Sequence, residues 1–204
     1  SIIERALIDA AGKAVECNYH TLVKKNLLGI DAGLVHAELA GRDITDAIPN
    51  VPAQSIAVRH TVGLGDPISD ADIATADRLN DGIPQSVEAW IREACVRYFK
   101  VKVCANLDID MPRLVAIATL LDAALPGAYH LTLDGNEQFH NVDELRAWYG
   151  ALRESGALRN LLSRVLLLEQ PIERSAALSD AGAQGLSGAT ELPPVIIDES
   201  DDNV

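Results

Sequence analysis

The chain has 204 residues, of which 48% are hydrophobic and 23% are charged, and its formal net charge is −13. This apolar fraction supports a folded core rather than a disordered chain. The negative charge argues against nucleic-acid binding, because a phosphate backbone requires a basic face. No apolar run approaches the roughly 18 residues of a membrane span, so we expect no membrane segment. Three well-separated cysteines, Cys17, Cys95 and Cys104, indicate reduced thiols in the core and a cytoplasmic protein.

The first part of the chain has a helical pattern. Ile3, Leu7, Ala10 and Ala14 recur at helical spacing, which predicts a helix with one apolar stripe. Residues 18–40 indicate further helix and loop. The polar stretch from Gly41 to Gln54 contains two prolines and is typical of a connector.

Strands and helices alternate from residue 56 onward. The predicted strands cover residues 56–62, 99–103, 129–134, 165–169 and 194–198. The predicted helices follow Ser86, Asp110 and Asn141, with shorter ones at 158–162 and 176–183, whereas 185–188 is expected to be a loop. This alternation is typical of βαβ units, so the sequence predicts an α/β protein with a parallel sheet of about five strands.

Three acidic residues each close a predicted strand: Asp134, Glu169 and Asp198. Parallel strands joined by right-handed crossovers place their carboxyl ends on one side of the sheet, so these carboxylates should converge there. Carboxylate oxygens are the ligands that hard divalent cations prefer, and the pattern therefore predicts a metal site.

Two lysines, Lys100 and Lys102, lie in the predicted strand 99–103. Side chains two residues apart in a strand point the same way, so both ammonium groups share one face. Paired lysines are commonly solvated edge residues. On an inner strand, however, their burial is costly without a chemical task, and this favours a functional role.

Four short motifs follow one another in an order that resembles the enolase superfamily. They are Lys100-Val101-Lys102, Leu133-Asp134-Gly135-Asn136, Leu168-Glu169-Gln170-Pro171 and Ile197-Asp198-Glu199-Ser200. The resemblance is closest to the muconate-lactonizing branch of the mandelate racemase/muconate lactonizing enzyme family. The segment from Glu4 to Lys13 is similar to a helix at the end of that family's capping domain, and His60-Thr61-Val62-Gly63 resembles its first barrel strand.

The resemblance implies a partial TIM-like (β/α) barrel of about five strands, preceded by the helical end of an α+β capping domain. Residues 1–54 would be the C-terminal part of the capping domain with its connector, and residues 55–204 the first part of the barrel. Because the family's later strands and the start of its capping domain are not matched, we expect a chain truncated at both ends.

The resemblance also implies Mg²⁺, with Mn²⁺ as a possible substitute, bound by Asp134, Glu169 and Asp198. Asp198 matches the family position of the third ligand, while Glu199, Asp201 and Asp202 compete with it. In the family, the residue that matches Lys102 removes the proton α to a substrate carboxylate, giving a metal-stabilised enediolate, and the residue that matches Lys100 neutralises that carboxylate. Asn136 and Thr61 are candidates for substrate binding.

The reaction implied is that of an epimerase, a cycloisomerase or an o-succinylbenzoate synthase-like enzyme acting on a small carboxylate. Two alternatives stay open: an acid-sugar dehydratase of the same superfamily, and a non-catalytic truncated fragment or pseudoenzyme. We expect a homo-oligomer for the full-length protein, with no nucleic acid or membrane as partner. The identity of the carboxylate substrate is left open.

Overall fold

The structure is a computed structural model that describes residues 2–200. The chain divides into two compact units, residues 1–56 and residues 57–204, which are described separately. No helix in the described part of the chain is long and apolar enough to cross a membrane.

The first unit is helical. It contains the α-helices α1 (Ile2–Ala14) and α2 (Tyr19–Lys24) and the short 3-10 helices η1 (Ala32–Leu34), η2 (Ala37–Leu39) and η3 (Ile44–Ala47). Asn18 caps α2 by accepting a hydrogen bond from the Thr21 amide, and Lys24 Nζ donates to the carbonyl oxygens of Thr45 and Ile48. The apolar stripe of α1 is not covered within this unit, because Ile3 and Leu7 are 72% and 65% exposed.

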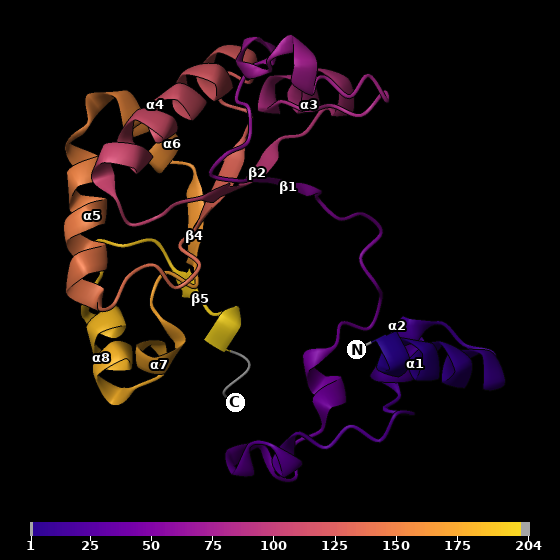
Figure 1. Cartoon of the computed structure of the whole chain (residues 1–204). Helices are drawn as coiled ribbons and strands as arrows, with labels where there is room; N and C mark the ends of the chain where they lie inside the picture. The colour runs from indigo at the N-terminus through magenta and orange to yellow at the C-terminus, as the bar shows by residue number, and fades with distance from the viewer. Residues whose placement is uncertain (1, 201–204) are drawn as a thin grey trace. The chain divides into compact units, whose positions relative to one another are not determined.

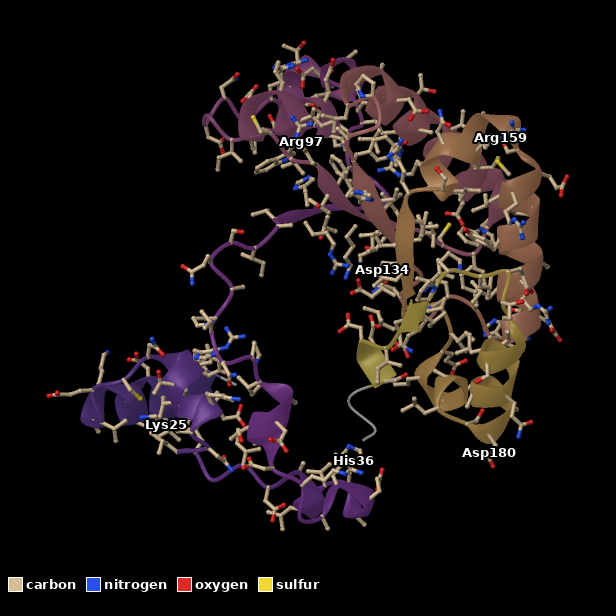
Figure 2. The ribbon with its side chains drawn as sticks, turned by 180° about the vertical axis from the view of Figure 1, so that it is seen from behind. Lys25, His36, Arg97, Asp134, Arg159 and Asp180 are labelled. Carbon is tan, nitrogen blue, oxygen red and sulfur yellow. The ribbon has the colours of Figure 1, made fainter. Side chains whose placement is uncertain are left out.

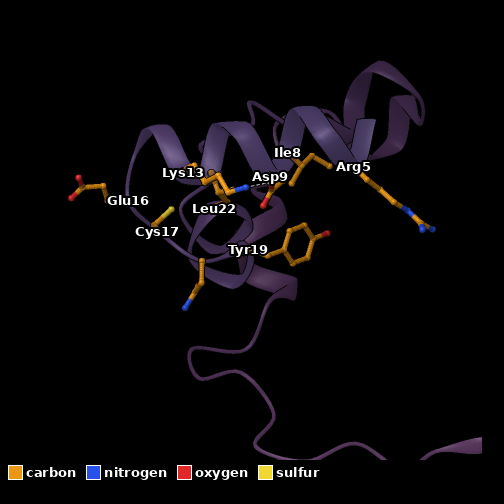
Figure 3. A pocket seen from close by; sticks show the side chains of 10 residues that line it. Arg5, Ile8, Asp9, Lys13, Glu16, Cys17, Tyr19 and Leu22 are labelled. Carbon is orange, nitrogen blue, oxygen red and sulfur yellow. Dashed lines mark hydrogen bonds and ion pairs between the residues drawn. The ribbon is translucent and has the colours of Figure 1, made fainter. Parts of the chain in front are cut away.

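A pocket of about 760 Å³ lies within the first unit, beside α1 and the start of α2 (Figure 3). Its charged lining includes the ion pair between Lys13 Nζ and Asp9 Oδ2, 2.6 Å apart and largely exposed. The residues that line it include none of the candidate catalytic or metal-binding side chains.

The second unit is built on a five-stranded sheet. Its strands are β1 (Arg59–Val62), β2 (Tyr98–Lys102), β3 (His130–Asp134), β4 (Val165–Glu169) and β5 (Val195–Ile196). All neighbours are parallel, and the strand order in the sheet follows the order in the chain. A doubly wound fold would reverse direction at a switch point, whereas a sequential order is that of a (β/α) barrel. The predicted α/β class with five parallel strands is confirmed.

Helices connect the strands. They are α3 (Val87–Ala94), α4 (Leu107–Ala124), α5 (Val142–Glu154), α6 (Arg159–Leu162), α7 (Arg174–Ala177) and α8 (Asp180–Gly188), with 3-10 turns η4 (Asp70–Asp72), η5 (Thr75–Asp77) and η6 (Gly156–Leu158). Helices α4 and α5 lie along one side of the sheet (Figure 1). Phe99 and Val101 of β2 are fully buried in the same apolar cluster as Leu114 and Leu121 of α4. The alternation of a strand therefore turns Lys100 and Lys102 to the opposite face.

Several predicted boundaries differ from the structure. The first strand begins at Arg59 rather than at residue 56, and Ile56 and Val58 before it are 90% and 74% exposed. Residues 185–188 belong to α8 rather than to a loop. The cysteines are free as expected, but none is buried, so the prediction of core thiols is wrong.

The start of α4 also differs from the prediction, because a different residue caps the helix. Asn106 caps the helix by accepting from the Asp108 amide at 3.0 Å, so the helix begins at Leu107. Asp110, expected to precede this helix, is instead buried within it, where it accepts hydrogen bonds from the amides of Cys104 and Asn106 and from Trp148 Nε1.

Candidate active site

The carboxyl ends of the strands carry one row of functional side chains. Lys102 of β2 is the register partner of Asp134 of β3, which in turn pairs with Glu169 of β4. Ile196 of β5 completes the row. Figure 2 labels Asp134 at this end of the sheet. The parallel register thus brings Lys102, Asp134 and Glu169 side by side at the carboxyl ends of their strands.

Asp134 is fully buried and meets both lysines. Its Oδ2 lies 2.7 Å from Lys100 Nζ and 2.8 Å from Lys102 Nζ, and its Oδ1 accepts from the Asn136 amide at 3.0 Å. Burial raises the pKa of this carboxyl group, but the lysine ammonium groups and the amide outweigh burial, so the net pKa lies below its usual value. Asp134 is therefore an anion at neutral pH.

Lys100 lies between two carboxylates. Its Nζ is 2.7 Å from Asp134 Oδ2 and 2.5 Å from Glu169 Oε1, and its side chain is only 14% exposed. Burial lowers the pKa of Lys100, but hydrogen bonds and charge interactions with the two acids outweigh it, so the pKa is raised overall. Lys100 is thus held as a cation, the state in which it can neutralise a carboxylate.

Arg59 is a site residue that the sequence analysis missed. Its Nη1 donates to Glu169 Oε2 at 2.9 Å and to Thr132 Oγ1 at 3.0 Å, so Glu169 is paired with two cations. The available signal was its position two residues before Thr61, which places both on one face of β1. Thr61 itself is the register partner of Lys100, but its exposed side chain makes no hydrogen bond to a described residue.

Hydrogen bonds through Asn136 connect Lys102 to a further acid, Glu199. Lys102 Nζ donates a hydrogen bond to Asn136 Oδ1, and Asn136 Nδ2 donates to Glu199 Oε1 at 2.7 Å. The other oxygen of Glu199, Oε2, is buried and has no hydrogen-bond partner among residues 2–200. Asn136 therefore lies between Lys102 and Glu199.

Asp198 does not join this cluster. Its side chain is exposed and has no hydrogen bond or ion pair within residues 2–200, although its backbone amide donates to Gln170 Oε1 at 2.7 Å. Strand β5 ends at Ile196, so the alternation expected over 194–198 does not extend to Asp198. The competing acids Asp201 and Asp202 lie outside the described residues.

The donor chemistry fits a hard cation only in part. Oxygens of Asp134 and Glu169 converge on one cation, the Lys100 ammonium group, as oxygens of a metal site would. The third predicted carboxylate is not beside them. Accordingly, residues 2–200 contain no group of three or more His, Cys, Asp or Glu side chains arranged to hold a metal ion.

Comparisons with known proteins give likeness in fold. No family model and no curated protein matches this sequence. Among solved structures, an N-succinyl Arg/Lys racemase from Bacillus cereus ATCC 14579 is 20% identical with a TM-score of 0.48, and the match covers 76% of this chain and 34% of that one. A mandelate racemase/muconate lactonizing enzyme from Roseiflexus sp. is 21% identical with a TM-score of 0.46, covering 72% and 35%.

A third structure, an enolase from Bradyrhizobium complexed with magnesium and mandelic acid, is 18% identical with a TM-score of 0.43, covering 72% of this chain and 33% of that one. At these identities the likeness concerns the fold alone. The chain spans about a third of the length of each of these three structures.

Proposed function

We propose that this chain carries part of the active site of an enzyme that removes the proton α to the carboxylate of a small substrate. The observation that carries the proposal is the row formed by Lys102, Asp134 and Glu169 at the carboxyl ends of three successive parallel strands. Barrel enzymes build their active sites at this face. Clustered, buried charges are costly for stability alone, which supports a chemical role.

Lys102 is the proposed base. Its side chain is 26% exposed, against 14% for Lys100, so it is the more accessible of the two side chains. The hydrogen bond to Asn136 Oδ1 fixes where that Nζ points. Lys100, held as a cation between two acids, is proposed to neutralise the substrate carboxylate, with Asn136 and Thr61 as further substrate contacts.

We further propose Mg²⁺, replaceable by Mn²⁺, as the cofactor, with Asp134, Glu169 and Asp198 as its ligands. The cation would supply positive charge that offsets the negative charge developing on the substrate carboxylate as the proton leaves. Asp134 and Glu169 already share one cationic partner, Lys100, with which a metal ion would compete. For Asp198 to become a ligand, the segment after β5 must turn this side chain toward the site.

We propose that residues 1–54 are the end of a capping domain with its connector, and that residues 55–204 are the first part of a barrel. The reaction is proposed to be an epimerisation, a cycloisomerisation or an o-succinylbenzoate synthase-like step in a homo-oligomer. A cytoplasmic compartment is supported by the three free cysteines, since disulfides are rare there.

One observation favours a second candidate, a non-catalytic protein. Asp134 is paired with two lysines and Glu169 with Lys100 and Arg59, so these anions are neutralised without any metal ion. A pseudoenzyme could keep such a cluster for its fold.

Exchange of the substrate α-proton with deuterated solvent, followed by NMR, separates the two candidates. Dipeptides and o-succinylbenzoate precursors are the first substrates to test, with and without Mg²⁺. We expect exchange by the unmodified protein, its loss in Lys102→Ala with metal binding retained, and no change in Lys25→Ala, an exposed lysine of the first unit. Full exchange by Lys102→Ala would show that the base lies elsewhere. Absence of both exchange and metal binding in the unmodified protein would favour the second candidate.

A further inference from the structure

The segment that carries Asp198 and Glu199 is held by one side chain, that of Gln170. This residue directly follows Glu169 and is 1% exposed. Its Oε1 accepts hydrogen bonds from the backbone amides of Asp198 at 2.7 Å and Ser200 at 3.0 Å. Its Nε2 donates to Ser200 Oγ and to the carbonyl oxygen of Ile172, both at 2.8 Å.

These four bonds use the full capacity of a carboxamide, which has two donor hydrogens and two acceptor lone pairs. A buried amide with every bond satisfied specifies one arrangement of its neighbours, because any other arrangement leaves a buried polar group unpaired. Gln170 also has a φ of 33°, in the left-handed region that side chains rarely adopt. Its backbone amide donates to the carbonyl oxygen of Ile196 at 2.8 Å, so backbone and side chain hold the same segment.

The sheet ladder cannot fix this segment by itself. The register between β4 and β5 ends with Glu169 opposite Ile196, two residues before Asp198. Beyond that point the Gln170 side chain provides the acceptor that a neighbouring strand would otherwise provide. It accepts hydrogen bonds from the amides of residues 198 and 200, on either side of Glu199. With both flanking amides fixed, Glu199 reaches Asn136 and the Asp198 side chain is left exposed.

We propose that Gln170 is a positioning residue that decides which acid after the fifth strand, Asp198 or Glu199, is presented to the lysine–carboxylate cluster. The four hydrogen bonds of the Gln170 side chain, called the clamp below, do not depend on the proposed function. Only the expected effect of the clamp on metal binding rests on the proposed function. Residues that orient metal ligands through hydrogen bonds typically change metal affinity about 10- to 100-fold when they are replaced.

Gln170→Asn is the sharpest test. Asparagine keeps the carboxamide and tolerates the left-handed backbone, but it is one methylene shorter and cannot reach the two amides. Gln170→Glu keeps the length and an acceptor oxygen for the two amides but removes both Nε2 donors, so it tests the acceptor bonds alone. Gln184→Asn is the matched control, because Gln184 is an exposed glutamine of α8 without a hydrogen bond to a described residue.

The first readout is amide hydrogen exchange of residues 195–200 in the metal-free protein, measured by mass spectrometry. We expect protection at Asp198 and Ser200 to fall at least about tenfold in Gln170→Asn, while the buried strand β3 stays protected as evidence of folding. Gln170→Glu should retain the protection, and Gln184→Asn should leave it unchanged. Unchanged exchange in a folded Gln170→Asn would overturn the proposal. Should that variant not fold, unchanged protection in a folded Gln170→Met, which keeps the length and removes all four hydrogen bonds, would do the same.

The second readout is Mg²⁺ and Mn²⁺ affinity by calorimetry, expected to change by about tenfold or more in Gln170→Asn, tighter if the released segment presents Asp198 and weaker if it withdraws Glu199, and to change little in Gln170→Glu. Faster exchange with unchanged affinity would overturn the positioning role. If the unmodified protein binds no metal while the exchange results are as expected, the clamp stands and the proposed function fails, so the two failures are distinguishable.

Discussion

Lys100 Nζ and Asp134 Oδ2 lie 2.7 Å apart at the carboxyl ends of neighbouring strands, one side chain 14% exposed and the other fully buried. Each group holds the other in its charged form: the pKa of Lys100 is raised and that of Asp134 is lowered, although burial acts against both shifts. The charges that the site uses therefore also contribute to the free energy of unfolding.

The pH dependence of folding follows from this pair. Because the pKa of Asp134 is lower in the folded than in the unfolded state, its contribution to stability is fully present above the unfolded value of about 3.9 and is lost as pH falls through the folded value. In urea unfolding between pH 2 and 7, the free energy of unfolding should fall toward low pH, and Asp134→Asn should make this fall smaller. An equal slope of stability against pH in both proteins would contradict the prediction.

Lys100 contributes in the opposite direction. Its raised pKa means that its stabilisation is fully present below the unfolded value of about 10.4 and is lost as pH rises through the folded value. Lys100→Met should lower the free energy of unfolding at pH 7 by about 3 kcal/mol, since it leaves two buried carboxylates short of one cation. Lys25→Met, at an exposed position, should change it by less than about 0.5 kcal/mol.

The same Lys100→Met change should strengthen metal binding. The Lys100 ammonium group occupies the space between Asp134 and Glu169, so its removal takes away both a competitor and a repelling positive charge. We expect the Mg²⁺ dissociation constant, measured by calorimetry, to fall several-fold while α-proton exchange weakens. A weaker affinity in this variant would mean that Lys100 supports the metal site instead of competing for it.

Metal binding should depend on the two buried acids together. The double variant Asp134→Asn, Glu169→Gln removes both negative charges of the row and should abolish Mg²⁺ and Mn²⁺ binding in the same titration. Asp108→Asn with Glu154→Gln, both exposed and outside the row, is the matched control. Unchanged affinity in the first double variant would disprove the assignment of these ligands.

Asp110 should be important for stability. It is 1% exposed and accepts from two backbone amides, Cys104 Sγ and Trp148 Nε1, so Asp110→Ala leaves four donors without their acceptor. We expect a loss of about 3 kcal/mol in urea unfolding. Asp108 lies in the same first turn of α4 but is exposed, so Asp108→Ala should lower the free energy of unfolding by less than about 1 kcal/mol.

The sequence was sufficient to predict the parts of the site that follow from strand periodicity. Lys100 and Lys102 share a face because they are two apart, and Asp134 and Glu169 meet because parallel strands end on one side. For Arg59 the strand pattern gave the face of β1 on which it lies but not its partner Glu169, and for Gln170 no local pattern indicated a role, because both roles depend on contacts between segments far apart in the chain.

The acid after the fifth strand could not be predicted for a different reason. Alternation along a strand can decide between Asp198 and Glu199 only if the strand continues to them, and β5 ends at Ile196. The buried position of Asp110 was hidden in a similar way, because Asn106 and not Asp110 provides the cap that starts α4. In both cases a side-chain hydrogen bond to the backbone, rather than residue periodicity, sets the geometry.

The sequential strand order has a consequence for how the site forms during folding. Since β2, β3 and β4 each pair with the strand before them in the chain, Lys102, Asp134 and Glu169 come together through the closure of short chain segments only. Closing these segments one after another costs less chain entropy than pairing strands that are farther apart in the chain. The lysine–carboxylate row can thus assemble as consecutive βα units dock, before the segment held by Gln170 is in place.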